Sequence, residues 1–156
     1  MTRRYLLDTN ALIALRDAVR HHEPKSAERQ ARIDRIRARC AQIPAEQLAM
    51  SFISLGELAV WAEKSADPVK ARVVLQQLLQ RVGAHGAGTG AAPGQAEDLA
   101  RRYAQVRATL ERQGQPIGTH DTWIAAHALV LGLTVVTNNI GEFSRVPGLA
   151  CEDWTA

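Results

Sequence analysis

The hydrophobic positions along the chain fall into two kinds of segment, short apolar runs and longer stretches with helical spacing. The short runs are rich in leucine and valine, and each is bounded by polar or turn-forming residues. Runs of this length and composition are typical of buried strands. We therefore predict strands over residues 4–7, 48–52 and 133–137, with a short edge strand over 149–151.

The longer stretches place apolar residues three or four positions apart, which is the spacing of one helix face. They predict helices from about Ala11, over 24–40, from Ile53, over 68–82, over 97–113 and from Asp121. Strands separated by helices indicate βαβ units. The sequence thus predicts an α/β fold, a three-layer α/β/α sandwich with a central, mainly parallel sheet and a ligand site beyond the carboxyl ends of the strands.

Two segments have distinctive compositions. Residues 24–40 carry five arginines around a thin apolar stripe, and the simplest interpretation is a solvated surface helix. Residues 83–95 are rich in glycine and alanine without periodicity, so we predict a flexible loop there. This loop is not a phosphate-binding loop, because the Gly-Lys-Ser/Thr ending is missing.

Length and composition limit the class of protein. A chain of 156 residues fits a single domain, 1–156, and 46% hydrophobic and 22% charged residues are ordinary for a globular protein. No apolar run approaches the roughly 20 residues that span a bilayer, and no signal peptide is evident, so we expect a cytoplasmic protein. Cys40 and Cys151 stand far apart and indicate free thiols. A net charge of +3 is compatible with a polyanionic partner.

Four polar residues occupy equivalent places in the predicted fold. They follow predicted strands or lie near the starts of predicted helices. Three are acids and one is an amide: Asp8, Glu57, Asp121 and Asn139. All four are expected at one edge of the sheet. Carboxylates held together raise one another's pKa, and a divalent cation stabilises such a cluster. Because the donors are all oxygens, Mg²⁺ or Mn²⁺ is the expected ion.

Each of these residues also has a purely structural interpretation. Asp8 could cap the helix that follows it, and Ser54-Leu-Gly-Glu57 fits a capping box. Asp121 sits where an N-cap belongs, and Asn139 is a common turn residue. For each residue alone the structural interpretation is at least as good as the functional one. Their shared placement at one predicted edge favours a site.

Several segments resemble the PIN domain, and most closely the VapC-like ribonuclease toxins of type II toxin-antitoxin modules. The segments are YLLDTNALIAL, SFISLGELAVWAEKS, GTHDTWIAAHALVLGLTVVTNNIGEFSRVPGL and the closing EDW. The resemblance covers most of the chain in the family's order. Its most specific part is Asp-x-x-Ile-Ala-Ala-His-Ala followed by a strand and Thr-x-Asn.

The resemblance implies a function and a set of site residues. It implies an endoribonuclease that uses one or two Mg²⁺ ions to hydrolyse RNA phosphodiester bonds. The implied catalytic residues are Asp8, Glu57, Asp121 and Asn139, of which the first three bind the metal. The candidates for hydrogen bonds that orient these ligands are Thr9, Asn10 and Thr137. A toxin of this type would bind a cognate antitoxin and form a homodimer.

Three features depart from the family pattern. Asn139 is often an aspartate in the family, and Glu142 is the candidate to replace the missing charge in this chain. Relatives tend to have a strand where residues 83–95 lie, so a third strand is in doubt. The arginine-rich stretch between Asp8 and Glu57 is longer than usual, and we interpret it as an insertion.

Other polar and aromatic residues add less. His120 precedes Asp121 and could approach a substrate, whereas His127 is expected to pack within its helix. The three tryptophans could stack on RNA bases, but packing in the core or at a dimer interface is the simpler expectation for Trp61, Trp123 and Trp154.

Two other functions compete with the nuclease. A haloacid-dehalogenase-like phosphatase also has an aspartate after its first strand, but it needs a second aspartate where this chain has Asn10. The other alternative is a PIN-like module that binds RNA or a protein without cleavage, because Asn139 lowers the number of acids. Cleavage that depends on Mg²⁺ would separate the nuclease from this module.

Overall fold

The computed structural model describes residues 4–20, 25–85 and 95–156. Its centre is a sheet of five parallel strands in the order β3-β2-β1-β4-β5. The strands are β1 (Tyr5–Leu7), β2 (Leu48–Ser51), β3 (Gly83–His85), β4 (Thr134–Val136) and β5 (Cys151–Glu152). The predicted α/β architecture with a parallel sheet is therefore confirmed, and β1 is the central strand.

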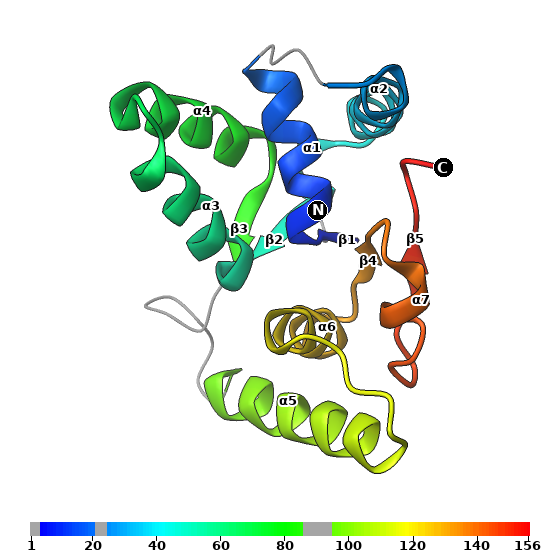
Figure 1. The fold of residues 1–156 in the computed structure, drawn as a ribbon. Helices are drawn as coiled ribbons and strands as arrows, with labels where there is room; N and C mark the ends of the chain where they lie inside the picture. The colour runs from blue at the N-terminus through cyan, green and yellow to red at the C-terminus, as the bar shows by residue number, and fades with distance from the viewer. Residues whose placement is uncertain (1–3, 21–24, 86–94) are drawn as a thin grey trace.

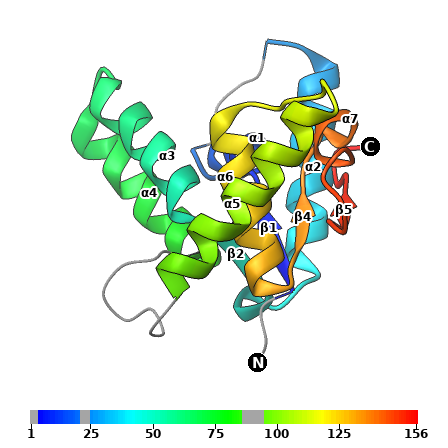
Figure 2. The ribbon, with the colours of Figure 1, turned by 90° about the horizontal axis from the view of Figure 1, so that it is seen from below.

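Within the described residues, seven α-helices cover the two faces of the sheet (Figure 1). They are α1 (Thr9–Val19), α2 (Ala27–Ala41), α3 (Phe52–Lys64), α4 (Pro68–Arg81), α5 (Gln95–Arg112), α6 (Thr119–Leu131) and α7 (Ile140–Phe143), with a 3₁₀ turn at Ala45–Gln47. Helices α1–α4 pack on one face and α5–α7 on the other. Figure 2 shows α5 lying beside α6 on that second face.

Alternate residues of the strands supply two separate cores. Leu7 pairs in register with Met50 and Val136, and these buried side chains join the core formed with α1–α4. The residues one position earlier in each strand point to the opposite face and join the core formed with α5–α7. A parallel sheet buried on both faces explains why its strands are continuous apolar runs.

Local chemistry sets several helix ends. Asp67 accepts a hydrogen bond from the backbone N–H of Lys70 at 3.1 Å, and Pro68 takes the first position of α4. Gly114, just beyond α5, and Gly132, the C-cap of α6, both have φ of +67°, where a glycine is favoured. The helical spacing, caps and glycines therefore agree on these boundaries.

The prediction of a flexible loop over 83–95 is wrong at both ends. Gly83–His85 forms β3, which pairs with Ala49–Ser51 of β2, and Gln95 is the first residue of α5. The third strand, doubtful from the sequence, is thus present, while residues 86–94 lie outside the described residues. Gly-Ala-His has no β-branched residue, so pairing with β2 creates this strand against its local propensity.

Other boundaries shift by a few residues. The strand predicted over 48–52 ends at Ser51, because the Ser51 hydroxyl accepts a hydrogen bond from the backbone N–H of Ile53 and starts α3 one residue early. The arginine-rich helix begins at Ala27, where Ser26 is the N-cap. In the parts of the chain that the structure describes, no helix is both long and apolar enough to cross a bilayer.

Candidate active site

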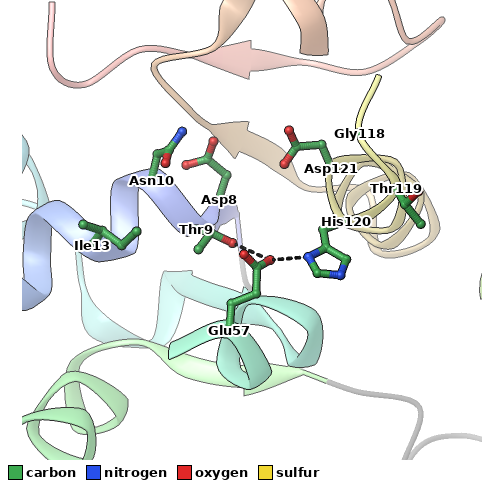
Figure 3. Close-up of a pocket in the computed structure, with 9 residues that line it drawn as sticks. All are labelled: Asp8, Thr9, Asn10, Ile13, Glu57, Gly118, Thr119, His120 and Asp121. Atoms are coloured by element: carbon green, nitrogen blue, oxygen red, sulfur yellow. Dashed lines mark hydrogen bonds and ion pairs between the residues drawn. The ribbon is translucent and has the colours of Figure 1, made fainter. Parts of the chain in front are cut away.

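A pocket of about 500 Å³ opens at the carboxyl end of β1, between α1, α3 and the start of α6 (Figure 3). Three of the four predicted site residues line it: Asp8, Glu57 and Asp121. Asp8 directly follows β1, and its backbone N–H bonds to the carbonyl of Val136 in β4 at 3.0 Å. The sheet order therefore brings residues from distant parts of the sequence to one edge, as the strand-end argument predicts.

Asp8 is the most deeply buried of the three acids. Its side chain caps α1 by accepting a hydrogen bond from the backbone N–H of Ala11 at 2.8 Å, so the capping interpretation is correct for this residue. The residue is 2% exposed, and burial raises the pKa of Asp8 from 3.8 to about 6, although a hydrogen bond from Thr137 opposes this rise. Capping and a role in the pocket coexist, because only one carboxylate oxygen is needed for the cap.

Glu57 reaches the pocket from the second turn of α3. Its Oε1 accepts a hydrogen bond from the Thr9 hydroxyl at 3.2 Å and lies 3.2 Å from Nδ1 of His120. The capping-box interpretation is wrong, because α3 already begins at Phe52 with Ser51 as its N-cap. Ser54 lies inside the helix, and its hydroxyl is 3.0 Å from that of Thr9. Glu57 is thus directed away from the helix terminus and toward α1 and α6.

Asp121 lies in the first turn of α6, and its carboxylate points toward the same space as that of Asp8 (Figure 3). The N-cap of α6 is Gly118, so the capping interpretation of Asp121 is wrong. Partial burial raises the pKa of Asp121, and the negative charges of Glu142 and Glu57 raise it further, while His120 lowers it. Burial and the neighbouring carboxylates thus both favour the protonated form of Asp121.

Asn139 lies beside the pocket and is absent from its lining. Its side-chain amide donates a hydrogen bond to Glu142 at 2.7 Å, and its backbone N–H donates to the Thr137 hydroxyl at 2.9 Å. Glu142 is close enough to Asp121 for its charge to act on the pKa of that residue. The pair of Asn139 and Glu142 thus forms a second polar layer behind Asp121.

The three residues predicted to orient the metal ligands do not all line the pocket. Thr9 and Asn10 line the pocket, whereas Thr137 is buried behind Asp8. The contact between His120 and Glu57 was not predicted, although the position of His120 next to Asp121 pointed to the pocket. His127, expected to pack, is 2% exposed with Nδ1 at 3.0 Å from the Ser51 hydroxyl.

The donor atoms suit a hard divalent cation. Among the described residues, no three side chains of His, Cys, Asp or Glu are arranged to hold a metal ion, and Glu57 is directed toward Thr9 and His120. Asp8 and Asp121 nevertheless present carboxylate oxygens to one polar pocket. Mg²⁺ needs only one or two protein carboxylates because it keeps several water ligands, so this donor set fits Mg²⁺ or Mn²⁺ and does not fit zinc.

Comparisons with known proteins agree with the fold. The model of the PIN domain matches residues 5–149. Ribonuclease VapC1 of Haemophilus influenzae (strain R2866) is 33% identical over 151 residues, which is 97% of this chain and 98% of the relative. The tRNA(fMet)-specific endonuclease VapC of Salmonella typhimurium (strain LT2) is 40% identical over 108 residues, covering 69% and 76% of the two chains.

Solved structures show the same similarity. A chain of DNA-bound VapBC from Salmonella typhimurium superposes with a TM-score of 0.77 at 33% identity, covering 98% of this chain and 99% of that one. A chain of VapBC-1 from nontypeable Haemophilus influenzae gives a TM-score of 0.76, again at 33% identity, with 97% and 98% covered. These matches exclude the phosphatase alternative and confirm the resemblance drawn from the motifs. The chain belongs to the PIN-domain family, and within it to the group similar to VapC ribonucleases.

Proposed function

We propose that the protein is an endoribonuclease that hydrolyses RNA phosphodiester bonds with the help of Mg²⁺, or of Mn²⁺, and that it is the toxin of a toxin-antitoxin pair. The observation that carries this proposal is that Asp8, Glu57 and Asp121 line one pocket at the carboxyl edge of a PIN-type sheet. Its similarity to VapC ribonucleases over nearly the whole chain supports RNA as the substrate class.

Asp8, Glu57 and Asp121 are the residues proposed to hold the metal. When bound, a divalent cation supplies an activated water and neutralises charge on the phosphate. Thr9 and His120 orient Glu57 through its Oε1, and Thr137 and Ala11 hold Asp8 from the other side. These contacts hold the carboxylates of Asp8 and Glu57 in the lining of the pocket.

Asn139 is proposed to complete the site without adding charge. Its amide donates to Glu142, and this hydrogen bond fixes a carboxylate whose charge acts on Asp121. A neutral amide in this place limits the repulsion that a further aspartate would add. Asn139 therefore positions Glu142, whose charge acts on Asp121.

A cognate antitoxin and a second copy of the chain are the proposed protein partners. The antitoxin is supported by the similar structures, which are VapBC complexes. The homodimer and a cytoplasmic location remain predictions from the sequence and the resemblance.

RNA cleavage with and without Mg²⁺ tests the proposal. Total tRNA is incubated with the wild-type protein and with Asp121→Asn, in Mg²⁺ and in EDTA. We expect cleavage only by the wild type in Mg²⁺, with a loss of at least about a hundredfold in Asp121→Asn, because one of the metal-binding charges is removed. Absence of cleavage by the wild type in Mg²⁺ would support a binding module without nuclease activity. Equal cleavage by Asp121→Asn would show that the activity does not depend on Asp121.

A further inference from the structure

A second cavity of about 360 Å³ lies between α1 and α2 and adjoins the acidic pocket. The two cavities share a wall, formed by Asn10 and Ile13. Arg29 and Arg32 of the arginine-rich helix α2 line the second cavity, and neither contributes to the proposed metal site. The cavity therefore gives this helix a candidate role beyond that of a solvated surface.

The charge around this cavity is positive. Arg29 lies 3.0 Å from Asp17, a buried aspartate that also bonds to Arg16 at 2.8 Å and has Arg20 within 3.9 Å. Arg32 pairs with the exposed Glu28 at 2.6 Å. Among the residues that line the cavity, Arg29 and Arg32 carry positive charges and Glu28 carries a negative charge, which leaves one excess positive charge. The side chains of Arg29 and Arg32 are half exposed, so both remain accessible to an anion.

The rest of the lining suits the other parts of a nucleotide. Ala14 and Ile33 add apolar surface to Ile13, and a sugar or base can pack on such a surface. At the junction of the two cavities, the amide of Asn10 lies 3.5 Å from that of Asn138. Amides and hydroxyls of this kind read base edges and the 2′-hydroxyl group of RNA.

We propose that the α1–α2 cavity is a subsite that binds the RNA nucleotide next to the scissile phosphate, with Arg32 and Arg29 contacting its phosphate. This assignment rests on the proposed function. The acidic pocket can hold a phosphate only together with a cation, whereas the neighbouring phosphate of the same strand needs positive side chains. Arginine supplies them through paired N–H donors that match phosphate oxygens.

An acidic peptide is a less suitable occupant. A peptide long enough to continue across the shared wall would bring its carboxylates against Asp8 and Asp121. An RNA strand in the same position also places a negative charge near Asp8 and Asp121. The divalent cation that the proposed reaction requires would neutralise that charge. The continuity of the two cavities therefore favours RNA.

Arg32→Ala is the principal test, because its ion pair with Glu28 is exposed and the fold should not depend on it. Arg29→Ala is the second variant, and its melting temperature is measured as well because Arg29 neutralises the buried Asp17. Arg37→Ala is the matched control, since Arg37 is an exposed arginine of α2 that is not part of the cavity lining. All three changes remove one positive charge from the same helix.

Binding of a short fluorescein-labelled RNA of random sequence is measured by anisotropy in the inactive Asp121→Asn background with Mg²⁺. We expect Arg32→Ala to weaken binding roughly tenfold and to lower the slope of log K against log salt by about 0.7, while Arg37→Ala changes neither. In the active background, Arg32→Ala should raise KM for RNA cleavage and leave kcat within about twofold.

Three outcomes would overturn the assignment. If the wild type cleaves RNA but Arg32→Ala and Arg29→Ala bind RNA as Arg37→Ala does, the subsite is wrong and the proposed function stands. If Arg32→Ala loses binding to poly-L-glutamate but not to RNA, the cavity belongs to an acidic peptide. If the wild-type protein cleaves no RNA, the proposed function fails and the subsite fails with it.

Discussion

Two features of the surroundings of Asp8 have opposite effects on its ionisation when no cation is bound. One carboxylate oxygen caps α1 through the N–H of Ala11, and this local bond favours the ionised form. Burial opposes ionisation more strongly, so the pKa of Asp8 rises to about 6. An ionised Asp8 is therefore costly to the folded state at neutral pH, and a bound cation would relieve that cost.

The first prediction at the residue scale concerns the stability of Asp8→Asn. Because the folded pKa of Asp8 is raised from 3.8 to about 6, the wild type loses stability as the pH rises through this window. The amide that replaces the carboxylate in this variant keeps a carbonyl oxygen for the cap and carries no charge. In EDTA at pH 7, we expect Asp8→Asn to raise the free energy of unfolding by about 1–3 kcal/mol.

Urea denaturation in EDTA at several pH values checks this prediction. The difference between variant and wild type should shrink as the pH falls from about 6 to about 4, and little of it should remain at lower pH, where Asp8 is protonated in both the folded and the unfolded state. A variant less stable than the wild type at pH 7 would show that the cap outweighs the burial of charge.

At the scale of elements, local chemistry marks several helix boundaries, whereas one strand has no local signal. Helical spacing, Pro68 and the glycines after α5 and α6 mark boundaries by local chemistry, and the structure agrees with them within a few residues. The strand β3 has no such signal, because Gly83 and Ala84 pair with β2 without strand propensity of their own. The capping box failed for a related reason, since a better cap at Ser51 starts the helix first.

The prediction at this scale compares two glycines. Gly132 has φ of +67°, which strains any residue with a Cβ, whereas Gly56 is exposed within α3 and a Cβ there would meet no atom within 4 Å. We expect Gly132→Ala to lower the free energy of unfolding by about 1 kcal/mol and Gly56→Ala to raise it by about 0.5–1 kcal/mol.

Thermal or urea unfolding of the two variants measures the difference. The pair is matched, because both changes add one methyl group and restrict the unfolded chain equally. Equal effects in the two variants would mean that the conformation of Gly132 does not matter for stability.

At the scale of the whole molecule, the order of the strands in the sheet brings the site residues together. Glu57 follows β2, Asp8 follows β1, and Asp121 precedes β4, and these three strands are neighbours in the sheet. Asp8 caps α1, Glu57 lies on α3 and Asp121 lies on α6, so the pocket is formed only when all three helices pack on the sheet. A ligand shared by the acids should therefore stabilise the complete fold.

Addition of Mg²⁺ tests this linkage. A cation that binds only the folded protein raises its stability by about 2.7 kcal/mol at 100 times its Kd. We expect the melting temperature of the wild type to rise by several degrees in Mg²⁺, and that of Asp121→Asn to change little. NaCl of equal ionic strength is the control, and an equal rise with NaCl, or in Asp121→Asn, would argue against a shared site.

The sequence by itself determined the periodicity of the helices, the apolar runs of the main strands and the motifs of the family, because each depends on residues close together along the chain. Only the tertiary structure decided that β3 pairs with β2, that Glu57 turns toward His120, and that Arg29 of α2 meets the buried Asp17 of α1. Such contacts depend on the order of strands and the packing of helices, which bring distant residues together and which no local pattern records.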